Sequence, residues 1–437
     1  MELSGKRVLI VGYGKSGKSA ERFLKSKNCE CIIFDDAVKK TWKNLCGKFD
    51  FAVLSPAIKK ESVAIKFISE NGVPIITEVE LGMLFLKTKN IIAVTGTNGK
   101  TTCVSLLEHI FLKSGKRAVA CGNNGITLTS VCESVGRNDF VILELSSFML
   151  EKIKNANFAV SCFLNFAPDH LDYHESEEEY FSAKKNIFKF QDKFGVAILN
   201  ADDSRLKKIE TKSHAFYFST QKKVKGVFVK ENDLTFFDGE KEEKLFSKNL
   251  IKLLGEFNLS NVCACTLIAK VCGISKNKIK NAVAFFQPVK HRLNEIISKP
   301  VRVFNDSKST NISSTLASLS CFDEKLILIL GGSDKGENFD RLFNEIKNKN
   351  CFLILTGKTA GKIKSYALKN DYSNYIVVKN FKKAILTALK NAKENDIVLF
   401  SPACASFDNF KNFEERGEFF TKIVEKYFAK NKNKKSV

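Results

Sequence analysis

Short runs of β-branched and apolar residues alternate with helix-like segments along almost the whole chain, and this alternation constrains the fold more than any other feature. The runs include RVLIVG, CIIFDD, FAVLSP, IIAVTG, FVILELS, AVSCFLNF, VAILNA, LILILGG, CFLILTG and DIVLFSP. Apolar strands separated by helices are typical of parallel sheets that are covered on both faces. The sequence therefore predicts an α/β fold, with a site expected where the strands end.

The length of 437 residues suggests two or three domains. A break around residues 87–90 precedes a second strand–loop–helix start, and Pro288 marks a linker before VRVFNDS begins a third unit. A polar, lysine-rich stretch from about residue 212 to 248 is typical of a hairpin. We therefore expect three consecutive domains, over residues 1–88, 89–288 and 289–437.

Composition predicts a globular protein of a reducing compartment. Hydrophobic residues make up 44% and charged residues 27% of the chain, and no apolar run reaches the ~20 residues of a membrane span. The chain enters a strand directly, without a signal peptide. The 13 cysteines are scattered and include no C-x-x-C pair, which indicates neither a disulfide framework nor a zinc site. We expect a cytoplasmic protein without membrane insertion.

The formal net charge of +22 suggests a nucleic-acid-binding protein, but the distribution of the charge argues against one. Arginine, which pairs best with phosphates and bases, is scarce, and the lysines are dispersed. The one basic run, KYFAKNKNKKSV, is most simply a frayed terminus. We expect no nucleic-acid partner, and the charge would instead favour small anionic substrates.

The segment VLIVGYGKSGKSAERFL contains the first of two glycine loops. Gly12, Gly14 and Gly17 form G-x-G-x-x-G between a strand and a helix, and Asp35 ends the next strand. The glycines let the backbone approach a diphosphate, and the helix N-terminus offers N–H donors to it. Three interpretations stay open: an NAD-dependent oxidoreductase, another diphosphate-containing ligand, and a packing turn without a ligand.

The segment IIAVTGTNGKTTCVSLLEHI contains the second loop. GTNGKTT, residues 96–102, resembles a shortened P-loop, because Val94 stands where a standard one has its first glycine. Lys100 is placed to hold β- and γ-phosphates and Thr101 to ligate Mg²⁺. Glu144 ends the later strand FVILELS, where P-loop proteins commonly carry a metal-binding carboxylate. A helix-capping role for Glu144 is the alternative.

His170 and Lys184 are weaker candidates from spacing alone. His170 follows a strand end in CFLNFAPDHLDYH, and a lone histidine is more often structural than a ligand. Lys184 lies in SEEEYFSAKKNIF, a helix with an acidic first turn, where a solvated lysine is the simplest interpretation. The case for both rests on the motifs around them.

Eight motifs together resemble one family, in the order GTNGKTT, ELSSF, LNFAPDHLDYH, SAKKNIF, GEFNLSN, HRLN, NDSKSTN and GGSDKG. Over essentially its whole length the chain resembles the Mur ligases, ATP-dependent amide-bond ligases of peptidoglycan precursor synthesis. The resemblance implies a Rossmann-like N-terminal domain for a UDP-linked substrate, a central P-loop ATPase-type domain for ATP, and a Rossmann-like C-terminal domain for the amino acid. SPACASFDNFKNFEERG, with GYGKSG and SPAI, is similar to members that act on UDP-N-acetylmuramoyl-L-alanine and D-glutamate.

The resemblance also implies roles for individual residues. ATP would be bound by Gly96, Thr97, Asn98, Gly99, Lys100, Thr101, Thr102, Asn258, Asn261 and Arg292. Two Mg²⁺ ions would be held by Thr101, Glu144, His170 and a carbamylated Lys184. The catalytic residues would be Lys100, His170, Lys184 and Lys335. The substrates would contact Gly14, Lys15, Ser16, Asp35, Ser55, Asn123, Lys308, Thr310, Ser406 and Phe413.

The implied reaction runs through an acyl phosphate. The γ-phosphoryl group of ATP moves to the substrate carboxylate, and the amine of D-glutamate then displaces phosphate. The alternatives are a Mur-type ligase for another amino acid and the oxidoreductase built on the first loop. Three positions differ from the family pattern, namely Ala37, Phe257 and Ser333, the last followed by Asp334. We expect the chain to act as a monomer.

Overall fold

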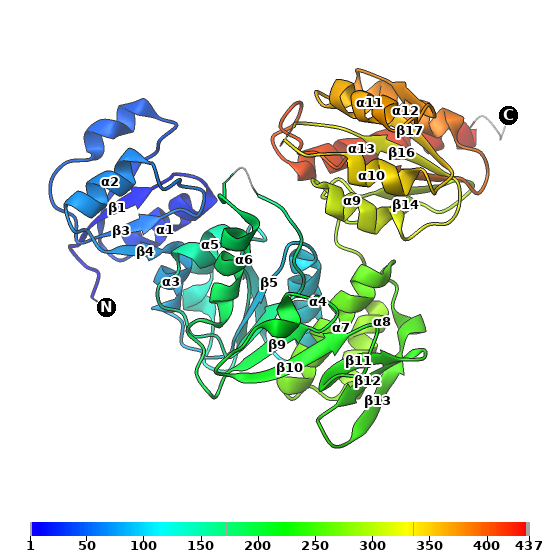
Figure 1. Cartoon of the computed structure of the whole chain (residues 1–437). Coiled ribbons are helices and arrows are strands. Elements are labelled where there is room, and N and C mark those ends of the chain that lie inside the picture. The colour runs from blue at the N-terminus through cyan, green and yellow to red at the C-terminus, as the bar shows by residue number, and fades with distance from the viewer. Residues whose placement is uncertain (1, 171–172, 335, 434–437) are drawn as a thin grey trace. The chain divides into compact units, whose positions relative to one another are not determined.

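The computed structural model describes residues 2–170, 173–334 and 336–433, whose strands form three sheets with helices between them (Figure 1). The α/β fold expected from the alternating pattern is therefore present. The chain divides into two compact units, Met1–Ile251 with Ser260–Phe286 and Lys252–Leu259 with Gln287–Val437. Each sheet falls within one of the three expected ranges, and the division into three domains stays a prediction.

The first sheet has four parallel strands in the order β2-β1-β3-β4. Alternate residues of β1 pack on opposite faces: Ile10 lies in the core with Leu24 of α1, and Leu9 with Ile68 of α2. This period of two is expected of a strand covered on both sides. The elements are β1 Arg7–Val11, α1 Lys15–Ser26, β2 Glu30–Phe34, β3 Phe51–Leu54, α2 Val63–Glu70, β4 Ile75–Thr77 and α3 Glu78–Met83.

The second sheet has nine strands in the order β13-β12-β11-β10-β9-β8-β5-β7-β6. Its strands are β5 Ile91–Thr95, β6 Ala118–Gly122, β7 Phe140–Glu144, β8 Val160–Phe163, β9 Val196–Asn200, β10 His214–Ser219, β11 Gly226–Lys230, β12 Asp233–Phe237 and β13 Glu242–Ser247. Its helices are α4 Lys100–Lys113, α5 Ser147–Lys152, α6 Glu177–Lys185, α7 Glu256–Val271 and α8 Lys276–Phe285. The expected hairpin is present as β11–β12, which β13 extends in antiparallel fashion.

The third sheet has six strands in the order β14-β15-β19-β16-β17-β18, parallel except for β14. Its strands are β14 Asn294–Ile297, β15 Arg302–Asn305, β16 Leu326–Leu330, β17 Cys351–Leu355, β18 Tyr375–Val377 and β19 Ile397–Phe400. Its helices are α9 Ile312–Leu319, α10 Asp340–Ile346, α11 Ala360–Lys369, α12 Phe381–Asn391 and α13 Phe413–Asn433.

Two features of the first unit join its two sheets. Buried side chains of both sheets share one apolar core, which includes Ile10 and Val141. Glu78 of α3, itself buried, accepts hydrogen bonds at 2.7 Å from both the backbone N–H and the hydroxyl of Thr129. The hydroxyl of Ser19 in α1 lies 2.8 Å from the same threonine hydroxyl. The two glycine loops are thereby carried on one packed unit.

All thirteen cysteines are free. Within the described ranges, every helix is too short or too polar to cross a lipid bilayer.

Candidate nucleotide-binding site

The second glycine loop connects β5 to α4, and glycine is required at the residue directly before the helix. Gly99 caps α4 with φ +87°, a left-handed conformation that side chains other than glycine rarely adopt. A Cβ atom at Gly99 would also lie 2.4 Å from Oδ1 of Asn261 on α7. The helix N-terminus that would face a phosphate therefore packs closely against Asn261, to which the family resemblance also gives a role in binding ATP.

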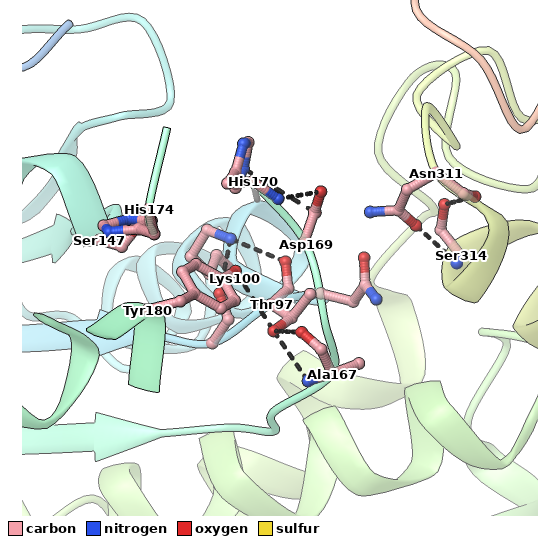
Figure 2. Close-up of polar contacts among 12 residues, drawn as sticks. Thr97, Lys100, Ser147, Ala167, Asp169, His170, His174, Tyr180, Asn311 and Ser314 are labelled. Carbon is pink, nitrogen blue, oxygen red and sulfur yellow. Dashed lines mark hydrogen bonds and ion pairs between the residues drawn. The ribbon is translucent and has the colours of Figure 1, made fainter. Parts of the chain in front are cut away.

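Hydrogen bonds fasten this loop to the segment that follows β8. Thr97 Oγ1 donates to the carbonyl of Ala167 and accepts from its N–H, both at 3.0 Å (Figure 2). The N–H of Asn98 donates to Oδ1 of Asn165 at 2.9 Å, and the amide of Asn165 returns a bond to the Asn98 carbonyl at 3.0 Å. The loop and the segment leading to His170 are thus preorganised together.

Two lysine ammonium groups converge on one carbonyl of the loop. Lys100 Nζ donates to the Gly96 and Thr97 carbonyls at 2.7 and 2.9 Å, and Lys184 Nζ donates to the Gly96 carbonyl at 2.8 Å. Only 1% of Lys184 is exposed. Burial, and then repulsion from Lys100, hold the pKa of Lys184 well below its usual value. The positive charge of Lys100 and the N–H groups at the N-terminus of α4 suit a polyphosphate.

Glu144, at the end of β7, is the strongest candidate metal ligand. Its side chain is 2% exposed, Oε1 accepts a 2.9 Å hydrogen bond from Nδ2 of Asn123, and Oε2 has no hydrogen-bond partner. A buried carboxylate oxygen without a donor is what a hard divalent cation requires. Across the described ranges, no group of three or more His, Cys, Asp and Glu side chains could hold a metal ion. Mg²⁺ here would need further oxygens, such as the Thr101 hydroxyl and phosphate.

His170 follows β8 with a left-handed backbone, φ 56°, which turns its ring beside Asp169 (Figure 2). Its Nε2 lies 3.8 Å from Oδ2 of Asp169, and its ring packs edge-on against Phe148 with centroids 4.9 Å apart. Asp169 was not among the predicted site residues, yet its charge acts on Lys184. The acidic residue directly before the histidine in APDHLD is the signal that could have identified it.

Tyr180 is a second neighbour that the sequence reasoning missed. It is buried on α6, its hydroxyl donates to Thr97 Oγ1 at 3.4 Å, and Lys184 Nζ lies 4.6 Å from its ring centroid. Burial raises the pKa of Tyr180. Tyr180 precedes Lys184 by four residues, so both lie on one face of the helix. That spacing is the available sequence signal, and the buried face keeps Lys184 out of water.

Two predicted substrate residues, Asp35 and Ser55, hydrogen-bond to the backbone of the first glycine loop. Gly12 has φ +86°, and a Cβ at Gly17 would lie 2.0 Å from the Gly12 carbonyl. Asp35 Oδ2 accepts from the Tyr13 N–H at 2.8 Å, and Ser55 Oγ donates to the Gly12 carbonyl at 2.8 Å. In this state Asp35 and Ser55 shape the loop through bonds to its backbone.

The remaining predicted residues of the first loop lie at the start of α1. Gly14 and Lys15 are exposed, and Ser16 lines a small pocket of about 10 Å³ with Pro56. A Cβ at Gly125 would lie 3.5 Å from Nζ of Lys15. The first loop and the turn that carries Asn123 are therefore neighbours within the first unit.

In the second unit, several predicted substrate residues lie at the carboxyl ends of β15 and β19. Lys308 Nζ lies 5.3 Å from the ring centroid of Phe413, and the Thr310 N–H donates to the Lys308 carbonyl at 2.9 Å. Ser406 is 2% exposed. Lys335 lies outside the described residues.

The contacts that Arg292 makes with Ser309 and Phe257 lie within the second unit. Arg292 donates to Ser309 Oγ at 3.3 Å and stacks 5.9 Å from the ring centroid of Phe257. The His291 ring nitrogen Nδ1 lies 3.0 Å from Nδ2 of Asn305, so His291 ties the linker to β15. Asn258 also belongs to this unit and donates to a backbone carbonyl, whereas Asn261 on the same helix belongs to the first unit.

Ala37 and Ser333 are the other two positions that differ from the family pattern, and the structure explains only the first. The N–H of Ala37 donates to Oδ1 of Asp35 at 3.0 Å, which needs no particular side chain at Ala37. The hydroxyl of Ser333 is buried without a hydrogen-bond partner, and Lys362 pairs with Asp334 at 2.9 Å.

Two buried charged residues organise this part of the second unit; Asp306 lies in NDSKSTN and Arg416 in SPACASFDNFKNFEERG, but neither was among the predicted site residues. Arg416 donates to Ser307 Oγ at 3.1 Å and to the carbonyls of Ser307, Cys404 and Ala405 at 2.8, 3.1 and 2.9 Å. Asp306 accepts from three serine hydroxyls, those of Ser309, Ser318 and Ser401. Burial raises the pKa of Asp306. Arg416 therefore joins the loop before Lys308 to the loop that holds Ser406.

A largely parallel sheet in which β5 enters a short P-loop, with a buried carboxylate on the neighbouring strand β7, defines a nucleotide-binding α/β protein. Two family patterns narrow this class: the Mur ligase middle domain matches residues 94–269, and the Mur ligase, glutamate ligase domain matches residues 291–404. A protein of Caldicellulosiruptor bescii named UDP-N-acetylmuramoylalanine--D-glutamate ligase is 34% identical, covering 97% of this chain and 98% of its own. A protein of Clostridioides difficile with the same name is 35% identical, covering 96% and 98%. The chain belongs to the Mur ligase family.

Solved structures share the fold at lower sequence identity. A pseudomurein peptide ligase type C from Methanothermus fervidus superposes with a TM-score of 0.64 at 18% identity, covering 97% of this chain and 100% of its own. The MurF ligase from Thermotoga maritima, solved in complex with ADP, gives a TM-score of 0.61 at 17% identity, covering 98% and 96%. These similarities support the fold alone.

Proposed function

We propose that this chain is an ATP-dependent ligase that joins D-glutamate to UDP-N-acetylmuramoyl-L-alanine in peptidoglycan precursor synthesis. The full-length similarity to ligases named for this reaction supports the substrates. The single structural observation that carries the ATP-dependent step is the convergence of Lys100 and Lys184 on the Gly96 carbonyl, at the N-terminus of α4. Lys100 at that point would neutralise charge that develops on a transferred phosphoryl group, and Lys184 lies close enough to contribute a metal ligand once carbamylated.

The proposed assignment of the sheets follows from where the candidate residues lie. The first sheet would hold the UDP moiety at the G-x-G-x-x-G loop, in a Rossmann-like domain. The second would bind ATP at residues 96–102, in a P-loop ATPase-type domain. The third, also Rossmann-like, would hold D-glutamate near Lys308, Thr310, Ser406 and Phe413, with Lys335 as a further cation. The boundaries 1–88, 89–288 and 289–437 are part of this proposal.

Thr101 and Glu144 would hold one Mg²⁺, and His170 with a carbamylated Lys184 a second. Mg²⁺, when bound, would neutralise the phosphate oxygens and orient them. The unpartnered Oε2 of Glu144 supports the first site. Asn123 keeps Glu144 oriented through its 2.9 Å bond to Oε1.

The environment of Lys184 supports carbamylation. The amine reacts with CO₂ only in its neutral form, since the nitrogen lone pair attacks the carbon, forms the C–N bond and releases one proton. Burial and the neighbouring Lys100 hold the pKa of Lys184 well below its usual value, which populates that neutral form. The product carries a carboxylate-like group, which would replace the neutral amine by a ligand for the second Mg²⁺.

Phosphate release from ATP tests the reaction. The full chain is incubated with ATP, Mg²⁺, bicarbonate and UDP-N-acetylmuramoyl-L-alanine, with D-glutamate, L-glutamate, L-lysine or no amino acid. Release that requires the sugar nucleotide and D-glutamate together is the expected result. Release with another amino acid would replace the substrate by that of a different Mur-type ligase. Absence of release under every combination would refute the proposal and return the first loop to the oxidoreductase interpretation.

Carbon-13 NMR tests the carbamate separately from turnover. In [¹³C]bicarbonate the wild-type chain is expected to show a carbamate signal, which the variant Lys184→Met should lack. Lys185→Met is the matched control, because Lys185 is the exposed neighbour on the same helix. A signal that survives in Lys184→Met, or disappears in Lys185→Met, would contradict the assignment.

The compartment and the oligomeric state complete the proposal. We place the reaction in the cytoplasm, since thirteen free cysteines suit a reducing compartment. The chain would act as a monomer of 49.0 kDa, which light scattering during size-exclusion chromatography would measure directly.

A further inference from the structure

A pocket of about 220 Å³ in the first unit lies outside the residues assigned to ATP, Mg²⁺ and the two substrates. Its apolar lining comes from the end of β3, the segment after it, α2 and β4, namely Leu54, Ile58, Ile65 and Ile75. These side chains belong to the core on the α2 face of the first sheet. The other wall comes from Glu151 and Lys152 at the end of α5 and from Lys154 directly after it.

Charge at this pocket is strongly one-sided. Four lysines line it, Lys59, Lys60, Lys152 and Lys154, against a single carboxylate, Glu151. Lys60 is paired with Glu151 at 3.3 Å and with Glu179 at 2.6 Å, so its charge is largely neutralised. Lys59 and Lys154 are exposed at the rim. The rim therefore keeps an excess of positive charge over an apolar floor.

Lys152 connects this pocket to the predicted substrate region. Its Nζ donates to the carbonyl of Pro56 and, at 2.7 Å, to that of Ile58, in the segment that begins with Ser55. The same side chain lines the smaller pocket that Ser16 and Pro56 share. Burial lowers the pKa of Lys152 to about 8. The amine thus lies between the two pockets and has one further N–H, because an ammonium group offers three donors.

We propose that this pocket binds a small amphipathic anion, whose apolar part lies on the isoleucine floor and whose carboxylate or phosphate is held by Lys152, Lys154 and Lys59. The volume is below the roughly 300–1,000 Å³ of pockets that enclose drug-sized ligands. The occupant is therefore a short aliphatic molecule or the end of a longer one. A neutral apolar molecule would leave the lysine rim unmatched, and a cation would be repelled by it.

Methyl NMR of the full chain with ¹³C-labelled isoleucine tests the site with probes of one chain length. Octanoate represents a carboxylate head, octyl phosphate a phosphate head, 1-octanol a neutral head and octylamine a cation. At least one anion is expected to shift the methyl signals of Ile58, Ile65 and Ile75 saturably. The Kd values of the alcohol and the amine are expected to be at least about tenfold higher than that of the anion. The two anions distinguish a fatty-acid-type from a phosphate-bearing ligand.

Two variants and a matched control locate the binding. Lys59→Glu combined with Lys154→Glu reverses charge at exposed rim positions and is expected to weaken anion binding about tenfold or more. Ile65→Phe fills the apolar floor and leaves every lysine of the pocket in place, and it is expected to weaken binding of the anion. Lys66→Glu, an exposed position on the same helix that does not line the pocket, is expected to leave the Kd unchanged within about twofold.

Three results would overturn the proposal. These are equal affinity for octanol and the anions, anion-induced shifts confined to other isoleucines, and anion binding that the charge-reversal and filling variants leave unchanged. Both variants are checked for native methyl spectra first. Since binding is measured without ATP or sugar nucleotide, failure here would leave the proposed ligase reaction untouched, and failure of the ligase assay would leave this site untouched.

Discussion

Replacing Arg416 by methionine should destabilise the second unit more than the same replacement at an exposed arginine does. The methionine keeps an apolar side chain of similar length but removes all four donors to Ser307, Cys404 and Ala405. Arg416 is 2% exposed, so the three backbone carbonyls would lose their charged partner away from water. A buried acceptor without a donor carries the full cost of its desolvation.

The magnitude follows from two opposing terms. Four hydrogen bonds to a charged group are worth about 1.5–3 kcal/mol each, and such values are not additive. Removing the guanidinium also relieves its own burial, which costs several kcal/mol per ion and which lowers the pKa of Arg416 to about 10. The net loss in unfolding free energy of the second unit is therefore expected to be about 3–5 kcal/mol. Arg416→Lys should fall between the two, because an ammonium group cannot reproduce the planar fork.

Native-state hydrogen exchange of the β16 and β19 amides measures this loss in the second unit alone. Arg341→Met is the matched control, since Arg341 is exposed on α10 of the same unit and should change stability by less than about 0.5 kcal/mol. The KM for D-glutamate is expected to rise in Arg416→Met, because Arg416 joins the loops of Lys308 and Ser406. Equal protection in Arg416→Met and Arg341→Met would refute the reasoning.

Three other substitutions test the first unit. Glu144→Gln keeps the shape but removes the charge offered to Mg²⁺, so phosphate release should fall by about 10²–10³-fold and half-saturating Mg²⁺ should rise; an unchanged Mg²⁺ titration would argue against a metal role. Gly99→Ala should abolish ADP binding by calorimetry, because the residue has φ +87° and a Cβ would clash, whereas Gly115→Ala, at φ +84° with open space, should bind normally. Glu78→Ala should cost about 1–3 kcal/mol in urea unfolding, because Thr129 loses the acceptor of two bonds. Burial raises the pKa of Glu78, so the folded state binds a proton at this carboxyl more tightly than the unfolded state does. Any excess in unfolding free energy of the wild type over Glu78→Gln should therefore shrink as the pH rises from about 4 through the folded-state pKa.

Strands and loops with a strong local pattern were predictable from the sequence. Both glycine loops lie between a strand and a helix, and the apolar runs are strands, because continuous burial in a parallel sheet leaves a continuous apolar signature. β4, β6, β14 and β18 lie outside the predicted runs. β6 reads AVACG, in which small residues replace β-branched ones, and β18 is a three-residue edge strand. Such strands form because neighbours offer hydrogen bonds, which local sequence does not report.

Site geometry was less predictable, because it depends on contacts distant in sequence. Spacing alone suggested that Lys184 is solvated, whereas Tyr180 and the Gly96 carbonyl enclose it. The unpartnered oxygen of Glu144 is likewise visible only in three dimensions. Arg416 and Asp306 lie within quoted motifs, but their structural role could not be predicted, since their partners are backbone carbonyls and serines scattered over the second unit.

The first unit is discontinuous in sequence, and this sets the order in which a ribosome can complete it. The phosphate loop needs α7: Asn261 packs against Gly99, and Cys265 of α7 donates to the carbonyl of Cys103, which lies 162 residues earlier. At about 5–20 residues per second, that helix leaves the ribosome roughly 8–30 s after the loop. During this interval the apolar side of α4 lacks its partner, and a nascent chain that ends at residue 251 is expected not to retain ADP. The machinery for phosphoryl transfer thus becomes competent late in synthesis, well after the first sheet has been made.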